Sequence, residues 1–218
     1  MGEYLNIINE KVVDYLIGCY RPLNEEFAAF RAKAEEDRVP IILPDAETLI
    51  LNLIRIKNPE NILEIGTAVG YSASCFAKAS DAHITTIEVK EEVAQEARKN
   101  IESFGLSDRI DVLCGDGEEQ IEGLDKTYQF IFIDAAKSHY KRFFDAAIKH
   151  ASNDAVIVCD NVLFKARVAS DEYDPNRKYK TNIRKMREFL EYLVSLDYAD
   201  TSVIPAGDGI SITVLRRK

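Results

Sequence analysis

Five short apolar runs, each followed by a segment long enough for a helix, constrain the fold of this chain most strongly. The runs lie at residues 62–65, 84–87, 110–113, 130–133 and 155–158. They are rich in β-branched residues and apolar throughout, which is typical of strands that are buried on both faces. Parallel strands that are covered by helices are buried in this way. The pattern therefore predicts an α/β fold with a doubly wound, mostly parallel sheet.

Two more apolar runs end the chain, at residues 201–204 and 210–215. Only residues 205–209 separate them, and a helical crossover needs a longer connection than this. We therefore expect the last strand of a seven-stranded sheet to run antiparallel to its neighbours.

The first part of the chain predicts helices rather than strands. Residues 3–58 carry apolar residues at helical spacing, and we expect three helices there. Pro22 and Pro44 fit the first turns of the second and third helices, and Asn58 fits the end of the third. We expect a single domain over residues 1–218 that combines a helical cap (1–58) with an α/β core (59–218).

Composition limits the function classes. The chain has 218 residues with 46% hydrophobic residues, and no apolar stretch approaches the roughly 20 residues of a membrane span, so we expect a soluble protein that is not exported and has no membrane partner. The four cysteines show no C-x-x-C spacing, which argues against a thiolate zinc site and suits a reducing cytoplasm. A net charge of −9 argues against non-specific coating of nucleic acid, although a local basic patch is compatible with it. A homodimer is the expected assembly.

A glycine turn follows the first apolar run. Gly66 and Gly70 give the spacing G-x-x-x-G directly before a helical segment, so backbone N–H groups can face a ligand there. Ala68 and Tyr71 stand where a dinucleotide-binding turn needs glycines, and a phosphate loop is absent from the sequence. The turn therefore favours a nucleoside ligand without phosphates.

Two further strand ends carry acidic residues. Glu88 lies 22 residues after Gly66, where a carboxylate can accept hydrogen bonds from both ribose hydroxyls. Asp116, between Gly115 and Gly117, could meet the base. Each residue alone has an ordinary alternative as a turn glycine, a helix cap or a loop acid. Their positions at three successive strand ends favour the ligand interpretation.

A second set of polar residues follows the fourth and fifth runs. Asp134, Asp160 and Asn161 supply three oxygen donors at one sheet edge, which suits Mg²⁺ with positions left for water and substrate. Mn²⁺ and Ca²⁺ remain alternatives, and a helix cap or loop pair is the structural alternative for Asp160 and Asn161. Lys137 lies three residues after Asp134, so its amine can reach the same edge if a helix begins there.

Four motifs in order resemble a known family. They are Glu64-Ile-Gly-Thr-Ala-Val-Gly-Tyr-Ser72, Glu88, Phe132-Ile-Asp-Ala-Ala-Lys137 and Asp160-Asn161. The sequence is similar to the cation-dependent S-adenosylmethionine O-methyltransferases, the group of the catechol and caffeoyl-CoA enzymes. The resemblance implies a Rossmann-like methyltransferase fold, with Mg²⁺ held by Asp134, Asp160 and Asn161, and with Lys137 as general base beside Asp134. It also implies that the methyl donor is surrounded by Glu64, Gly66, Thr67, Ser72, Glu88, Asp116 and Asp134.

Within this group the chain most resembles the bacterial tRNA 5-hydroxyuridine methyltransferases. The matching motifs are Val39-Pro-Ile41, Asp134-Ala-Ala-Lys137 and Asp160-Asn-Val-Leu-Phe-Lys165. The resemblance implies methylation of 5-hydroxyuridine in the tRNA anticodon loop. Ala136 stands where catechol methyltransferases carry a tryptophan, which disfavours catechol itself. Small phenols and acyl-CoA esters remain alternative substrates, and a non-catalytic nucleotide-binding or RNA-binding module is the alternative of another class.

A basic segment follows the expected metal ligands. Residues 165–187 contain eight basic and three acidic residues, in contrast to the acidic chain as a whole. Such a segment can hold phosphates at the mouth of the site, and Tyr173 and Tyr179 could stack on unpaired bases. A solvated helix face is the alternative. The candidate RNA contacts are Lys165, Arg167, Arg177, Lys178 and Lys180.

Overall fold

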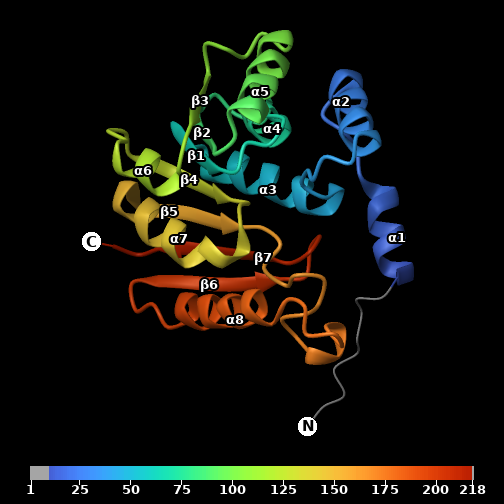
Figure 1. Cartoon of the computed structure of the whole chain (residues 1–218). Helices are drawn as coiled ribbons and strands as arrows, with labels where there is room; N and C mark the ends of the chain where they lie inside the picture. The colour runs from blue at the N-terminus through green and yellow to red at the C-terminus, as the bar shows by residue number, and fades with distance from the viewer. Residues whose placement is uncertain (1–9, 218) are drawn as a thin grey trace.

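The computed structural model describes residues 10–217 (Figure 1). Its strands are β1 (Asn61–Ile65), β2 (His83–Glu88), β3 (Ile110–Cys114), β4 (Tyr128–Ile133), β5 (Ala151–Cys159), β6 (Ala199–Ile204) and β7 (Ile210–Leu215). Its α-helices are α1 (Glu10–Cys19), α2 (Glu25–Glu36), α3 (Pro44–Lys57), α4 (Tyr71–Ala79), α5 (Glu91–Ser103), α6 (Gly117–Glu122), α7 (Tyr140–Ala147) and α8 (Lys180–Val194). Three short 3₁₀ helices are η1 (Lys137–His139), η2 (Ile148–His150) and η3 (Asp171–Tyr173).

The strands form one seven-stranded sheet in the order β3-β2-β1-β4-β5-β7-β6. Strands β1 to β5 pair in parallel, and β7 pairs antiparallel with both β5 and β6. The predicted fold class, including the antiparallel last strand, is confirmed. The chain order reverses between β1 and β4, and the carboxyl ends of the parallel strands are where open α/β sheets bind ligands.

Alternate residues of each strand enter two hydrophobic layers. Ile62, Phe130 and Phe132 pack with α2, α3, α4 and α5 on one face of the sheet. Leu63 and Ile131 pack with α6, α7 and α8 on the other face. This alternation explains why the sequence shows continuous apolar runs, since both faces of each central strand are covered.

The N-terminal helices differ in part from the prediction. Pro44 begins α3 as expected, and Asn58 ends it in a left-handed conformation. Pro22 lies outside α2, which instead begins at Glu25 because the Asn24 side chain accepts a hydrogen bond from the Phe27 amide. The part of the first predicted helix before Glu10 lies outside the described residues.

The expected boundary between cap and core at residue 58 lies between α3 and β1. Both elements contribute to the same hydrophobic layer. Ile50 and Ile54 of α3 are fully buried against the sheet, in the same cluster as Ile62. Helices α1 and α2 stand at one side of the sheet (Figure 1), and Phe27 of α2 still reaches that cluster. Helix α3 is therefore part of the core.

The state of the cysteines and the lengths of the helices are seen directly in the structure. The four cysteines, Cys19, Cys75, Cys114 and Cys159, are all free. None of the helices within residues 10–217 combines the length and apolar character needed to cross a membrane. Cys75 and Cys159 are buried, where they serve as small apolar residues.

A buried ion pair joins the N-terminal helices to α4. The guanidinium of Arg31 in α2 binds the carboxylate of Glu47 in α3, and the two residues are 6% and 1% exposed. The hydroxyls of Tyr20 and Tyr71 each donate to Glu47 at 2.8 Å, and Arg31 donates to the Ile42 carbonyl at 2.8 Å. Arg31 therefore satisfies a carboxylate that has no access to water.

We predict that Arg31→Met lowers the free energy of unfolding by about 3–5 kcal/mol, because Glu47 is left charged and buried without its partner. Urea unfolding followed by circular dichroism measures the change. The control is Arg184→Met, which removes an exposed ion pair with Glu188 and should cost at most about 0.5 kcal/mol. Equal losses in the two variants would contradict a special role for the buried pair.

Candidate active site

A cavity of about 570 Å³ opens at the carboxyl ends of the parallel strands. Its walls come from the loops after β1, β2, β3, β4 and β5 and from the segment before α3. The main lining residues are Pro40, Ile41, Ile42, Gly66, Thr67, Ala68, Tyr71, Ser72, Glu88, Gly115, Asp116, Gly117, Asp134, Lys137, His139, Phe143 and Asn161. The structure thus brings together the glycine turn and most of the polar residues that the sequence singled out.

Two backbone segments meet at the floor of the cavity. The amide of Asp134 donates to the Ile65 carbonyl at 2.9 Å, and the Gly66 amide donates to the Ile87 carbonyl at 3.0 Å. A Cβ atom on Gly66 would lie 1.9 Å from the Asp134 carbonyl oxygen, and Gly66 has a φ of +107°. Only glycine fits at this point.

Glu88 lies beside the glycine turn at the end of β2. Its two carboxylate oxygens accept hydrogen bonds from the Ala68 and Lys90 amides, each at 3.1 Å. A carboxylate oxygen has lone pairs for further donors, and Glu88 still lines the cavity. Glu88 can therefore accept a hydrogen bond from the backbone at the start of α5 and still accept hydrogen bonds from a ligand.

Asp116 combines two roles in the same way. Its Oδ1 atom caps α6 by accepting hydrogen bonds from the amides of Glu118 and Glu119 at 3.0 and 3.4 Å. It also lines the cavity, together with Gly117 and the ring of Phe143. Asp116 and its two neighbouring glycines therefore form part of the cavity wall, as the glycine turn after β1 does.

Thr67 and Ser72 line the cavity but are largely buried, at 1% and 9% exposed. The Thr67 hydroxyl lies 2.6 Å from the Thr86 hydroxyl, so this side chain points into the sheet layer. Ser72 lies in the first turn of α4, next to the glycine turn. The Thr67 hydroxyl and backbone amide are therefore both engaged within the protein, the amide with the Ile87 carbonyl at 3.2 Å.

Glu64, which the resemblance places beside the methyl donor, does not line the cavity itself. It is fully buried on β1 and accepts a hydrogen bond from Thr86 on the neighbouring strand β2. Burial raises the pKa of its carboxyl to about 8, and hydrogen bonds from Ser72 and Thr86 oppose this shift. Glu64 lies behind the wall of the cavity and supports the residues that face it.

Asp134, Asp160 and Asn161 converge at one edge. Asp134 and Asn161 line the cavity, whereas Asp160 is 1% exposed behind them. The Asn161 amide donates to Asp160 Oδ1 at 2.6 Å, but Asp160 Oδ2 is buried without a hydrogen-bond partner. Burial, and then the nearby Asp134, raise the pKa of Asp160 to about 7, and burial also raises the pKa of Asp134.

The half-buried carboxyl of Asp134 opposes the ionisation of the fully buried carboxyl of Asp160, and a cation between them would favour both charges. Within the described residues there is no group of three or more His, Cys, Asp or Glu side chains that could hold a metal. The candidate set here is two carboxylates and one amide oxygen, and the unpartnered Asp160 oxygen fits a hard cation.

Lys137 begins the 3₁₀ helix η1, so the helical turn expected directly after Asp134 starts later. The Lys137 amine nevertheless reaches the same edge and donates to Asn161 Oδ1 at 3.3 Å. It also lies 5.5 Å from the centre of the Phe164 ring. The loop after β4 therefore directs Lys137 towards Asn161 without a helix at Asp134.

Sequence reasoning missed the cavity-lining rings of Tyr71 and Phe143, and also Phe164 beside Lys137. The Phe164 ring is near both Lys137 and Arg167 and contacts the ring of Tyr179 at a centroid distance of 5.2 Å. Phe164 and the next two residues, Lys165 and Ala166, have φ values of +49°, +53° and +61°. This conformation costs roughly 1–2 kcal/mol for each residue that has a Cβ atom. Periodicity gives no signal for such a segment.

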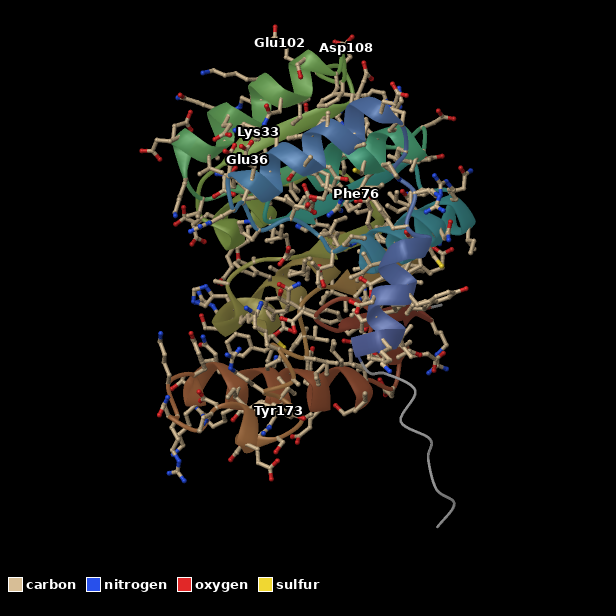
Figure 2. All side chains as sticks on the ribbon, turned by 90° about the vertical axis from the view of Figure 1, so that its right-hand side faces the viewer. Lys33, Glu36, Phe76, Glu102, Asp108 and Tyr173 are labelled. Atoms are coloured by element: carbon tan, nitrogen blue, oxygen red, sulfur yellow. The ribbon has the colours of Figure 1, made fainter. Side chains whose placement is uncertain are left out.

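The predicted basic residues form two groups. Lys165 is exposed on the loop after β5, and Arg167 stacks on Phe164 and Tyr179 at 5.1 and 4.7 Å. Exposed Arg177 and Lys180 line a separate hollow of about 610 Å³, where Arg187 is already paired with Asp171. Lys178 is exposed next to Tyr179. Tyr173, also exposed, lies on the loop before α8 (Figure 2).

We predict that Gly66→Ala lowers the free energy of unfolding by at least about 2 kcal/mol, because the new methyl group collides with the Asp134 backbone in a left-handed conformation. Urea unfolding measures this loss. Gly18→Ala in α1 is the matched control, since nothing lies within 4 Å and alanine favours a helix, so this variant should not be destabilised. A Gly66→Ala protein as stable as the wild type would contradict the close approach.

Comparison with known proteins identifies the family. The O-methyltransferase family model matches residues 22–218. Caffeoyl-CoA O-methyltransferase 1 of Eucalyptus globulus is 30% identical over 171 residues, which cover 73% of this chain and 68% of that protein. A crystal structure from Staphylococcus aureus, provisionally named a caffeoyl-CoA O-methyltransferase, superposes with a TM-score of 0.87 at 34% identity and covers 93% of this chain and 98% of that chain.

A second solved structure is the O-methyltransferase from Bacillus cereus in complex with SAH, which has a TM-score of 0.80 at 28% identity. The match covers 94% of this chain and 97% of that chain. Sequence motifs, fold and relatives agree. The chain belongs to the O-methyltransferase family that includes the caffeoyl-CoA enzymes.

Proposed function

We propose that this enzyme transfers a methyl group from S-adenosylmethionine to the 5-hydroxyl of 5-hydroxyuridine in tRNA, with Mg²⁺ bound at Asp134, Asp160 and Asn161. The observation that carries the proposal is that the glycine-turn cavity meets two neighbouring carboxyls, those of the cavity-lining Asp134 and the buried Asp160. The methyl donor can occupy the cavity, and the acceptor can reach the edge formed by Asp134 and Asn161. Methyl transfer from a sulfonium to an oxygen needs this alignment of two bound reactants.

The cavity suits a nucleoside with a short charged tail. Glu88 can accept hydrogen bonds from ribose hydroxyls, and the Gly115–Gly117 turn with Phe143 offers space for a flat base. The backbone at Gly66 and Ala68 permits close approach, and the turn has no lysine for a phosphate. The SAH bound by the Bacillus cereus relative fits this description.

The acceptor side suits a hydroxyl that must lose its proton. A bound divalent cation lowers the pKa of a hydroxyl that it contacts and offsets the charge of nearby carboxylates. The Lys137 amine lies 3.3 Å from Asn161 Oδ1, where it can take up the proton of an acceptor hydroxyl. Asp134, Asp160 and Asn161 would hold the cation, for which Mn²⁺ and Ca²⁺ are alternatives to Mg²⁺.

The basic segment supports a nucleic-acid acceptor. Lys165 is exposed shortly after Asn161, and Arg177, Lys178 and Lys180 are exposed further along the same segment, where they can contact phosphates of a long acceptor. The adjacent 4-carbonyl and 5-hydroxyl oxygens of 5-hydroxyuridine can chelate a cation as a catechol does. The names of the relatives favour a second candidate, an acyl-CoA ester such as caffeoyl-CoA. A homodimer is part of the same proposal and is tested by sedimentation.

The carboxyl pair generates a prediction for pH and cations. The pKa of Asp160 is raised on folding, so the native state binds more protons than the unfolded state between pH 3.8 and about 7, and this contribution to stability falls as pH rises through that range. Without divalent cations, Asp160→Asn should therefore be less sensitive to pH than the wild type. Mg²⁺ should raise the melting temperature of the wild type at pH 8 more than at pH 5.

Melting temperatures from thermal unfolding, measured in chelator and in Mg²⁺, test this prediction. Asp200→Asn, which changes an exposed carboxylate on β6, is the control and should behave as the wild type. A wild-type melting temperature that does not change with Mg²⁺ at either pH would contradict a cation site at Asp160.

The tRNA acceptor is tested with labelled S-adenosylmethionine, using tRNA that carries 5-hydroxyuridine, caffeoyl-CoA and a dihydroxyphenol as acceptors. We expect methylation of the tRNA. Combined replacement of Arg177, Lys178 and Lys180 by alanine should weaken it and reduce the salt slope by about 2, because up to three phosphate contacts are lost. Methylation of any small acceptor should remain unchanged, since it needs only the cavity and its edge.

The charge control replaces three exposed lysines elsewhere, Lys33, Lys78 and Lys99, by alanine. This variant should keep the wild-type salt slope. Methylation of caffeoyl-CoA but not of tRNA would replace the tRNA proposal with the acyl-CoA one. Equal loss on all acceptors in the basic-segment variant would indicate a folding defect.

A further inference from the structure

The tip of the β6–β7 hairpin holds the loop that follows β5. The amides of Val162 and Leu163 donate to the carbonyls of Gly209 and Asp208 at 2.9 and 3.0 Å. The Lys165 amide donates to the Asp208 side chain at Oδ1. Two of these bonds use backbone acceptors that any sequence could supply. The third depends on the side chain of Asp208.

That third bond falls in the middle of a disfavoured backbone segment. Phe164, Lys165 and Ala166 are all in the left-handed region, and none of them is glycine. Residues with a Cβ atom leave this region readily unless other contacts hold them there. The Asp208 carboxylate is the side-chain contact that fixes the amide of the central residue.

The hairpin tip is itself anchored. The Gly207 amide donates to Asp45 of α3 at 2.7 Å. A Cβ atom on Gly209 would lie 2.3 Å from Leu163, so the tip and the loop fit closely only with glycine there. Asp208 therefore presents its carboxylate from a support that is tied to the core.

The conformation of the loop after β5 determines which side chains lie near Lys137. It places the Phe164 ring 5.5 Å from the Lys137 amine and 5.1 Å from the Arg167 guanidinium. The Asp208 carboxylate is also close enough to interact electrostatically with Lys137, Lys165 and Arg167, and with Asp134. Release of the Lys165 amide would let Phe164 move away from Lys137 and Asn161.

We infer that Asp208 is a positioning residue of the acceptor side, which acts by holding Phe164, Lys165 and Ala166 in their left-handed conformation. The inference rests on the proposed methyl transfer at the edge formed by Asp134 and Asn161. Asp208 acts through its hydrogen-bond acceptor, so its charge is secondary. The methyl-donor cavity does not include Asp208 and should not depend on it.

The test compares Asp208→Ala, which removes the acceptor, with Asp208→Asn, which keeps an Oδ1 acceptor but removes the charge. Amide hydrogen exchange of the segment 161–168 measures the loop without any need for activity. We expect exchange at Lys165 to rise about tenfold in Asp208→Ala and to stay near the wild-type rate in Asp208→Asn. Asp200→Ala, on the same hairpin but in an ion pair with Arg216, is the control.

Kinetics then separate the acceptor from the donor. For the acceptor that the wild type methylates, kcat/KM should fall about 10- to 100-fold in Asp208→Ala and little in Asp208→Asn. The Kd for S-adenosylmethionine and the melting temperature should match those of Asp200→Ala. If Asp208→Ala lost affinity for S-adenosylmethionine and also had a lower melting temperature, the inference would be overturned, because Asp208 would then have a general structural role.

A second substitution tests the backbone argument. Ala166→Gly favours the left-handed conformation, because glycine adopts it without strain. In the Asp208→Ala background it should recover part of the lost kcat/KM, and the absence of recovery would contradict positioning through the backbone. Equal losses in Asp208→Asn and Asp208→Ala would assign the effect to charge and overturn the inference. A wild-type enzyme that methylates no acceptor would refute the proposed function, while hydrogen exchange would still decide whether Asp208 holds the loop.

Discussion

The contact between the backbones of Gly66 and Asp134 is the constraint on which the site depends. Strands β1 and β4 are neighbours in the sheet and end at the same edge, so the loops that follow them must pass each other. They pass without an intervening side chain, since a Cβ on Gly66 would overlap the Asp134 carbonyl. As a result, the turn that borders the cavity and the first carboxylate of the acceptor edge share one hydrogen-bonded corner. In the proposed reaction, backbone geometry at this corner would bring donor and acceptor together before any side chain acts.

This corner concentrates carboxyl groups that the fold alone does not favour. Burial raises the pKa of Glu64, Asp134 and Asp160, and Asp160 keeps one oxygen without a partner. Two well-packed hydrophobic layers supply the stability that tolerates such groups. Perturbed acids in and directly behind the wall of a cavity at the switch point of an α/β sheet are typical of a functional site. The cost of burying these groups is therefore best understood as a requirement of ligand binding.

The sequence predicted the sheet because strand burial leaves a direct record in composition. Runs such as 130–133 are apolar at every position, since both faces of β4 are covered. The helix starts were predicted less well. Pro22 suggested a first turn, but the side chain of Asn24 caps α2 and moves its start to Glu25. Glu64 was expected to face the cavity because its motif does, yet strand alternation turns its side chain towards Thr86.

The acceptor wall could not be predicted, for a different physical reason. Strand ends fix Asp134 and Asn161, whereas Phe164 owes its place to a left-handed segment held from a hairpin more than 40 residues later in the sequence. Neither periodicity nor composition encodes such a long-range contact. Donor and acceptor walls are thus specified by separate parts of the chain: the glycine turn and the first three strand ends on one side, and the loop after β5 with its hairpin support on the other. If the proposed function holds, the second part can vary without disturbing the first, so a change of acceptor requires no change in the donor site.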